Sequence, residues 1–256
     1  MNSEVIMRYS KDSVIYFGFL NGKNLSRIEG DLFDGYTQTG VVDNLSEVKT
    51  LFPYEPRQIF AVGRNYKSHL KDRDQPKRPE IFFKPYSSLL NPEDPIILPK
   101  DATDVHLEGE LVIVIGQKTS RVSINNASEA VYGISCGNDV SERRWQRGPD
   151  KDLQWWRAKG SNTFAPFGPV IARVPHFDNL LLKTQLNGTV VQKQRTSDLI
   201  FDVPTIISYI SHYVTLWPGD IIFTGTPGNT EPLAPGDVVD VEIEDVGILS
   251  NPVSRQ

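Results

Sequence analysis

The stretch HLEGELVIVIG, from His106 to Gly116, places two glutamates two residues apart at the start of an apolar run. The aliphatic residues Leu111 to Ile115 end at a glycine, which predicts a strand with both faces largely covered. Side chains alternate between the faces of a strand, so Glu108 and Glu110 share one side. Burying two unpaired carboxylates is costly. The stretch alone leaves two interpretations open, a solvated strand end or a site for a hard divalent cation.

Composition narrows the classes of partner. A chain of 256 residues can bury a large core, and its net charge of -5 gives no reason to expect nucleic acid or an anionic membrane as a partner. No apolar run is long enough to span a bilayer, and charges interrupt the first twenty residues, which do not resemble a signal peptide. Cys136 is the only cysteine, which excludes an intrachain disulfide and favours a cytoplasmic location.

The pattern of strands and turns predicts an α+β fold that is mainly β. Residues 1–55 read as a small N-terminal β-rich domain with a hairpin at Asn21-Gly22, and residues 56–256 as a larger domain. A second hairpin signal occurs at Asn187-Gly188, and the clearest helix begins after Asp202, a suitable cap. Hairpin signals favour antiparallel pairing.

Other polar residues are ambiguous when each is taken alone. Asp139, in GNDVSER, is a candidate third carboxylate, although Asn-Asp pairs are typical of turns. Lys159 is a single cation in a loop rich in glycine and aromatic residues, or simply a surface lysine. His69 and Asp72 are three residues apart, so on a helix they form either an oriented imidazole or an ordinary surface pair. The small residues of FTGTPGN, 223–229, allow backbone donors to approach an anion, or form a tight turn.

Taken together, these segments resemble a known family. The blocks GRNYKSH, FFKP, HLEGELVIVIG, GNDVSER, AKGSNTFAPFGP and IFTGTPGN occur in the order found in the fumarylacetoacetate hydrolase family. The resemblance extends from about Arg57 to the C-terminus. It implies a mixed β-roll or sandwich catalytic domain, usually a homodimer, with a divalent metal. It is much less specific for the reaction, because the family includes C–C hydrolases, decarboxylases, isomerases and hydratases.

The resemblance also implies a metal centre. Glu108, Glu110 and Asp139 match the metal-binding carboxylates of the family. Their oxygen ligands suit Mg²⁺, with Mn²⁺ or Ca²⁺ as alternatives. Lys159 matches the active-site lysine, whose ammonium would stabilise a developing enolate or the substrate carboxylate.

Further residues match parts of the family site that contact substrate or water. His69 and Asp72 match a dyad on a short lid segment, in which the imidazole activates water and a carboxylate orients it. Asp72 is one methylene shorter than the glutamate common at this position. Gln146 resembles a glutamine that positions water or substrate. Thr226, with the backbone near Gly225, matches the contact to the substrate carboxylate.

Basic residues near these blocks are candidates for binding a second acidic group of the substrate. They are Arg64, Lys84, Arg143 and Arg144.

The resemblance leads to a functional expectation, an enzyme that acts on a small 2-oxo acid through a metal-stabilised enolate. Because His69 is followed by a carboxylate, we favour C–C hydrolysis of an acylpyruvate-like β-diketo acid. The alternatives are decarboxylation of an oxaloacetate-like acid, and isomerisation or hydration of an unsaturated 2-oxo-dioate in aromatic catabolism. A different class, a non-catalytic binding module, is disfavoured because Glu108, Glu110, Asp139 and Lys159 are all present.

Overall fold

The computed structural model describes residues 4–70 and 73–256, and these form an α+β structure that is mainly β, as expected. The strands are β1 (Glu4–Lys11), β2 (Val14–Asn21), β3 (Asn24–Asp31), β4 (Gly35–Asn44), β5 (Lys49–Thr50), β6 (Ile59–Gly63), β7 (Glu80–Phe83), β8 (Leu89–Leu90), β9 (Ile96–Leu98), β10 (Val105–His106), β11 (Gly109–Ile115), β12 (Val131–Asn138), β13 (Ser141–Glu142), β14 (Ala165–Arg173), β15 (Leu181–Leu186), β16 (Thr189–Arg195), β17 (Ile221–Phe223), β18 (Val238–Ile243) and β19 (Gly247–Arg255). The α-helices are α1 (Lys67–Leu70), α2 (Ile124–Ala127), α3 (Arg143–Arg147), α4 (Trp156–Gly160) and α5 (Val203–Tyr213).

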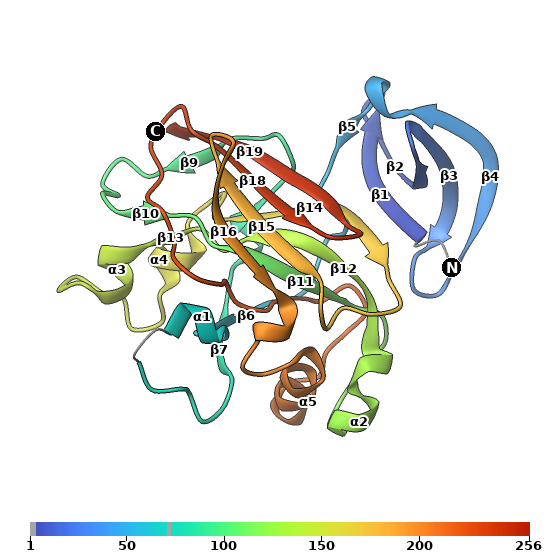
Figure 1. Ribbon diagram of the computed structural model, residues 1–256. Helices are drawn as coiled ribbons and strands as arrows, with labels where there is room; N and C mark the ends of the chain where they lie inside the picture. The colour runs from blue at the N-terminus through green and yellow to red at the C-terminus, as the bar shows by residue number, and fades with distance from the viewer. Residues whose placement is uncertain (1–3, 71–72) are drawn as a thin grey trace.

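The N-terminal strands β1 to β4 form a consecutive antiparallel run (Figure 1). Asn21 pairs with Asn24, which confirms the first predicted hairpin. β1 also pairs with β14, through Glu4 opposite Arg173, so the N-terminal strands extend the main sheet. The division into domains at residues 55 and 56 stays a prediction.

Two sheets form the body of the molecule. The larger sheet continues from β1 in the order β14-β12-β11-β17-β6-β7, and a five-stranded sheet has the order β16-β15-β18-β19-β9. Most pairings are antiparallel, as the hairpin signals indicate. The pairs β17–β6, β14–β8 and β19–β9 are parallel. Parallel pairs join strands that are distant in sequence, so turn signals cannot reveal them.

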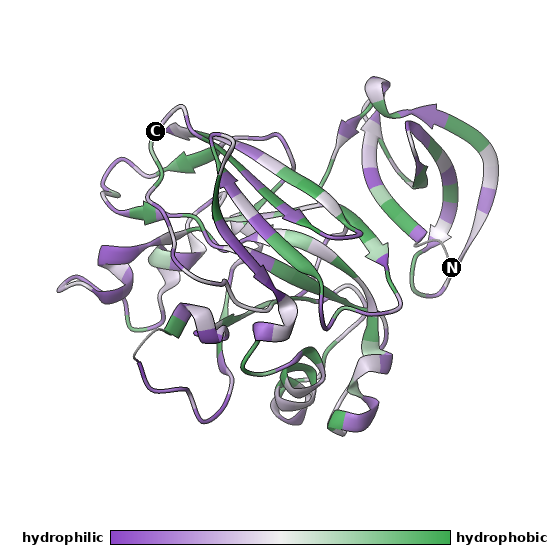
Figure 2. Cartoon of the chain, in the orientation of Figure 1, coloured by the Kyte–Doolittle hydropathy of each residue, from purple (hydrophilic) through white to green (hydrophobic). Residues whose placement is uncertain are grey.

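Strand β11 is buried along its whole length, which confirms the strand predicted from the apolar run. Leu111 and Ile113 belong to the core that also contains Val241 of the five-stranded sheet. Val112, which faces the other way, packs in a second core with Phe223. Figure 2 shows the hydrophobic residues concentrated in the central strands and the hydrophilic residues more abundant on loops and on β16.

Helix α5 begins as predicted. The side chain of Asp202 accepts a hydrogen bond of 2.9 Å from the amide of Thr205, and Pro204 lies in the first turn. No helix in the described ranges has the length and apolar character needed to cross a membrane. The short helices α1, α3 and α4 lie on the side of the main sheet where β11 begins and β12 ends (Figure 1).

Candidate active site

An acidic cluster lies where β11 begins and β12 ends. Gly109 pairs with Asn138 in the antiparallel register, and the amide of Asp139 donates to the carbonyl of Glu108 at 2.9 Å. This register places Glu108, Glu110 and Asp139 together, with ligand oxygens all within 4.8 Å of one another. All three side chains are buried. The solvated strand end is therefore excluded, and the carboxylates require positive charge nearby.

Three cations surround two of these carboxylates. The ammonium of Lys159 lies 2.6 Å from Glu108 Oε2 and 2.5 Å from Asp139 Oδ2. The ammonium of Lys84 lies 2.5 Å from Asp139 Oδ1 and also donates to the backbone carbonyl of Lys159. The guanidinium of Arg143 lies 2.5 Å from Glu108 Oε1. Lys84 was considered from sequence for a second acidic group of the substrate, but it is buried against Asp139 instead.

Glu110 differs from its neighbours because none of the described residues forms an ion pair with it. Its Oε2 accepts a hydrogen bond of 2.7 Å from the amide of Gly225. Burial, together with the negative charges of Asp139 and Glu108, raises the pKa of Glu110 well above its ordinary value. Burial also acts to raise the pKa of Glu108, but the positive charges of Arg143 and Lys159 outweigh it and hold that pKa low.

The cluster fits a hard divalent cation. Its donors are all carboxylate oxygens, the ligand type that Mg²⁺, Mn²⁺ and Ca²⁺ take. Glu110 forms no ion pair with any described residue, so a bound cation would supply the positive charge that this buried carboxylate lacks. Glu108, Glu110 and Asp139 are therefore the residues that would hold the metal.

Gly109, between the two glutamates, permits the two sheets to approach closely. A Cβ at Gly109 would lie 2.0 Å from Thr184 Oγ1 of β15. The side chain of Gln192 on β16 accepts from the amide of Gly109 at 3.1 Å and donates to Thr226 Oγ1 at 2.9 Å. Thr226 in turn donates to the carbonyl of Gly109 at 2.9 Å. Gln192 is not predicted as a site residue from the sequence, because a polar residue in a β hairpin has the same sequence signal as a surface position.

His69 lies opposite the carboxylates, on helix α1. Its Nδ1 is 2.6 Å from the carbonyl oxygen of Gly228, so Nδ1 carries the proton and Nε2 is the basic nitrogen. Burial lowers the pKa of His69 below its ordinary value. Ser68 anchors the same turn, because its amide donates to Asp198 Oδ2 at 2.9 Å. Asp72, the predicted partner of His69, lies outside the described residues.

An inner cavity of about 30 Å³ brings eight of the predicted site residues together. They are Arg64, His69, Glu108, Glu110, Asp139, Gln146, Lys159 and Thr226. Two further predicted site residues adjoin them. Arg143 contacts Glu108 and also donates to Gln146 Oε1 at 2.9 Å, and Gly225 lies behind Glu110.

The wall of this cavity also contains aromatic side chains that were not among the predicted site residues. Trp155 packs edge-on against Phe82, with ring centroids 5.5 Å apart, and both line the cavity. The neighbouring Trp156 is 68% exposed. Trp155 therefore shapes the inner cavity, whereas Trp156 faces solvent.

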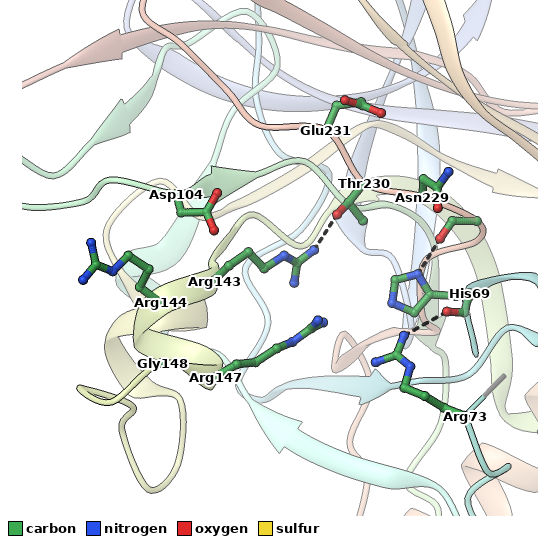
Figure 3. Close-up of a pocket in the computed structure, with 11 residues that line it drawn as sticks. His69, Arg73, Asp104, Arg143, Arg144, Arg147, Gly148, Asn229, Thr230 and Glu231 are labelled. Atoms are coloured by element: carbon green, nitrogen blue, oxygen red, sulfur yellow. Dashed lines mark hydrogen bonds between the residues drawn. The ribbon is translucent and has the colours of Figure 1, made fainter. Parts of the chain in front are cut away.

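A larger cleft of about 770 Å³ adjoins the inner cavity (Figure 3). His69 and Arg147 line both spaces. Arg73, Arg143 and Arg144 also line the cleft, so its surface is strongly basic.

Comparison with known proteins agrees with this geometry. The family model described as fumarylacetoacetate (FAA) hydrolase, C-terminal, matches residues 58–254. The chain belongs to the fumarylacetoacetate hydrolase family. A second model, described as Rv2993c-like, N-terminal, matches residues 6–53. The family membership confirms the resemblance seen in the sequence blocks.

Some relatives in the fumarylacetoacetate hydrolase family carry a reaction in their names, and others do not. An uncharacterised protein of Archaeoglobus fulgidus is 44% identical over 228 residues, which is 88% of each chain. A mitochondrial oxaloacetate tautomerase of Bos taurus is 38% identical over 223 residues, 81% of this chain and 70% of that protein.

Solved structures in the family share the whole fold. The 5-carboxymethyl-2-hydroxymuconate delta-isomerase of Mycobacterium smegmatis superposes with a TM-score of 0.92 and 38% identity, over 98% of this chain and 100% of that one. A Sphingobium maleylpyruvate hydrolase, solved with manganese(II) and pyruvate, superposes with a TM-score of 0.81 and 27% identity, over 98% and 99% of the two chains. Family members are thus enzymes of several reaction types acting on small acids.

Proposed function

We propose that this chain is a divalent-metal-dependent enzyme that hydrolyses a C–C bond of an acylpyruvate-like 2-oxo acid. The observation that carries the proposal is the inner cavity itself. It combines three buried carboxylates, Lys159 and the basic nitrogen of His69. A metal held by these carboxylates, proposed as Mg²⁺, would supply Lewis-acid stabilisation of negative charge on the substrate's keto oxygen.

Each of the protein groups would then have a separate role in the reaction. His69 Nε2 takes a proton from water, and the water oxygen forms a bond to the acyl carbonyl carbon. The bond between that carbon and the pyruvate methylene breaks, and its electron pair remains with pyruvate as an enolate. The ammonium of Lys159 stabilises the enolate charge, and the imidazolium of His69 returns its proton to the enolate carbon, which yields pyruvate beside the released carboxylic acid. Thr226 donates its hydroxyl proton to the carbonyl of Gly109 in this structure, and it would contact the substrate carboxylate by turning that hydroxyl toward it.

A second candidate reaction is isomerisation or tautomerisation of an oxo-dioate, with oxaloacetate decarboxylation as a third. The relatives named as an oxaloacetate tautomerase and a muconate isomerase favour the second candidate. A neutral His69 suits proton transfer between carbon and oxygen as well as activation of water.

A substrate panel with added magnesium tests the proposal. We expect the wild-type protein to cleave an acylpyruvate or fumarylpyruvate, and His69→Ala to lose about 10²–10⁴-fold of that rate. Oxaloacetate decarboxylation needs no activated water, so His69→Ala should retain most of it on the same preparation. Cleavage of the acylpyruvate by His69→Ala at the wild-type rate would overturn the hydrolase assignment. So would a wild-type protein that turns over only oxaloacetate or an unsaturated oxo-dioate.

The assembly and location remain proposals as well. The family resemblance supports a homodimer, and the single buried cysteine is compatible with a reducing compartment such as the cytoplasm. Light scattering during size-exclusion chromatography tests the dimer directly.

A further inference from the structure

Two consecutive side chains of α1 bind the backbone of the same residue, Gly228. His69 Nδ1 donates to the Gly228 carbonyl oxygen at 2.6 Å (Figure 3), and Ser68 Oγ accepts from the Gly228 amide at 3.2 Å. The hydroxyl and the imidazole therefore share one partner residue. A shift of the Gly228 amide relative to Ser68 also moves the carbonyl that accepts the imidazole proton.

Hydrogen bonds, rather than side-chain packing, fix the backbone at Gly228. A Cβ built on Gly228 would meet no other atom within 4 Å, and its φ of +57° lies in the left-handed region that glycine adopts readily. The peptide unit before it is held from two sides. Its carbonyl, that of Pro227, accepts from Gln192 Nε2 at 2.7 Å, and its amide donates to Ser68. Removal of the Ser68 hydroxyl would free this peptide to rotate.

Ser68 is itself held by Asp198, which is 130 residues away in the sequence. The amide of Ser68 donates to Asp198 Oδ2 at 2.9 Å, and a hydrogen bond to a charged acceptor is stronger than one between neutral groups. Asp198 ends the short 3₁₀ helix Thr196–Asp198, which follows β16. The buried hydroxyl of Thr196 donates to the carbonyl of Phe177 at 2.9 Å, so the start of this helix is fixed in the fold.

The residues after Asp198 run beside the residues before Ser68. The amide of Ile200 donates to the carbonyl of Asn65 at 2.8 Å, and Leu199 forms an isolated bridge with Tyr66. The side chain of Asn65 is fully buried and donates to the carbonyl of Thr224 at 2.8 Å, on the strand end that leads to Gly228. The three segments that carry Asp198, Ser68 and Gly228 are thus joined independently of His69.

These contacts bear on which nitrogen of His69 is basic. A neutral imidazole carries its proton on either nitrogen, and the hydrogen bond at one nitrogen decides which form is populated. We propose that Asp198 and Ser68 are positioning residues that hold the Gly228 carbonyl against Nδ1 and so keep Nε2 unprotonated. Neither residue lines the inner cavity, so both act through His69. The inference rests on the proposed function, in which Nε2 is the base.

Nitrogen-15 NMR of the imidazole tests this role without catalysis. At a pH where His69 is neutral, the wild-type protein should show a protonated Nδ1 and a bare Nε2. In Ser68→Ala and Asp198→Ala, the shifts should move toward a protonated Nε2, because the Gly228 carbonyl is no longer held in place. Asp198→Asn should remain closer to wild type, since its amide oxygen still accepts from Ser68. His69→Ala assigns the signals among the four histidines.

Kinetics with an acylpyruvate and magnesium give a second measurement. We expect kcat to fall by about ten- to a hundredfold in Ser68→Ala and Asp198→Ala, because the base is misplaced or carries its proton on the wrong nitrogen. KM and the Kd for magnesium should stay near their wild-type values, since neither side chain reaches the carboxylate cluster. Asp198→Asn should recover most of kcat.

Ser197→Ala is the matched control. Ser197 is exposed on the same 3₁₀ helix, and its hydroxyl donates to Asn179 Oδ1 at 3.0 Å, away from α1. This variant should keep both the tautomer and kcat of the wild-type protein.

An unchanged tautomer in Ser68→Ala and Asp198→Ala, even with a loss of stability, would overturn the positioning role while leaving the proposed function intact. An equal change in Ser197→Ala, or a bare Nδ1 in the wild-type protein, would also overturn it. Failure of the wild-type protein to cleave any acylpyruvate would instead overturn the proposed function. The NMR comparison would then still decide whether Asp198 and Ser68 set the tautomer of His69.

Discussion

The ammonium of Lys159 lies 2.6 Å from the carboxylate of Glu108, and both side chains are almost completely buried. Lys159 also contacts Asp139, so one lysine compensates two of the three carboxylates. Removing one partner of a buried ion pair leaves an unpaired charge, which is more costly than loss of a surface pair. Lys159 therefore has a structural role in the metal-free protein besides its proposed role with the enolate.

Lys159→Met tests this structural role. We expect the metal-free variant to lose about 3–5 kcal/mol of unfolding free energy, because Glu108 and Asp139 lose a buried partner. Magnesium should raise the midpoint temperature of the variant more than that of the wild-type protein, since the cation replaces the missing charge. Thermal unfolding with and without magnesium measures both effects. An equal magnesium shift in the two proteins would contradict the prediction.

Glu110→Gln should have opposite effects on stability and on metal binding. The amide is neutral, so it removes the cost of burying a carboxylate and the repulsion from Asp139 and Glu108, which together raise the Glu110 pKa. The metal-free protein should therefore become more stable near pH 7, where the carboxyl ionises in the unfolded chain. An amide is also a weaker ligand than a carboxylate for a hard cation, so magnesium affinity should fall at least about tenfold. Calorimetry and thermal unfolding measure the two changes. The exposed Glu129→Gln serves as a control, and wild-type magnesium affinity in Glu110→Gln would refute the assignment.

The pH dependence of His69 should follow its buried position. Burial disfavours the imidazolium ion, so the pKa of His69 lies below the ordinary value of 6.5. The neutral base is then fully present above that value, and kcat/KM should fall only as pH decreases through the lowered pKa. Any stability that the neutral imidazole contributes is lost in the same direction, as pH falls below 6.5. An NMR titration, with His69→Ala used for assignment, would contradict this if the imidazole titrated at or above 6.5.

Gly109→Ala should weaken the contact between the sheets at the site. Its Cβ would lie 2.0 Å from Thr184 Oγ1, and both residues are in paired strands that cannot easily move apart. We expect a loss of about 1–3 kcal/mol or more in denaturant unfolding. Adding Thr184→Gly should recover part of the loss in a double-mutant cycle, because it removes the clashing hydroxyl. Strict additivity of the two changes would argue against a direct clash.

Gln192→Leu should weaken the hydrogen bonds that connect the start of strand β11 to the loop that carries Thr226. The buried hydroxyl of Thr226 and the amide of Gly109 each lose a hydrogen-bond partner, which predicts a loss of about 1–3 kcal/mol. We also expect KM for the oxo acid to rise while the Kd for magnesium is unchanged. Gln194→Leu, two residues along β16 and partly exposed, is the control. An unchanged KM in Gln192→Leu would remove the positioning role.

The sequence by itself determined the family, the mainly β fold and the residues at the centre of the site. Those inferences depend on local signals: an apolar run such as Leu111–Ile115, hairpin turns such as Asn187-Gly188, and ordered blocks containing Glu108 and Asp139. Each of these signals lies within a few neighbouring residues, so it can be recognised without knowledge of the rest of the chain.

Only the tertiary structure determines which charged and polar side chains lie next to one another. Lys84, 55 residues before Asp139, is buried against it, and Gln192 reaches Gly109 from the other sheet because β15 and β16 lie over the start of β11. Arg147 faces His69 although Arg144 on the same helix does not (Figure 3). A lysine, a glutamine or an arginine has the same sequence signal on a surface as in a site. The burial and neighbouring charges that distinguish the two arise only when distant strands pair and sheets pack.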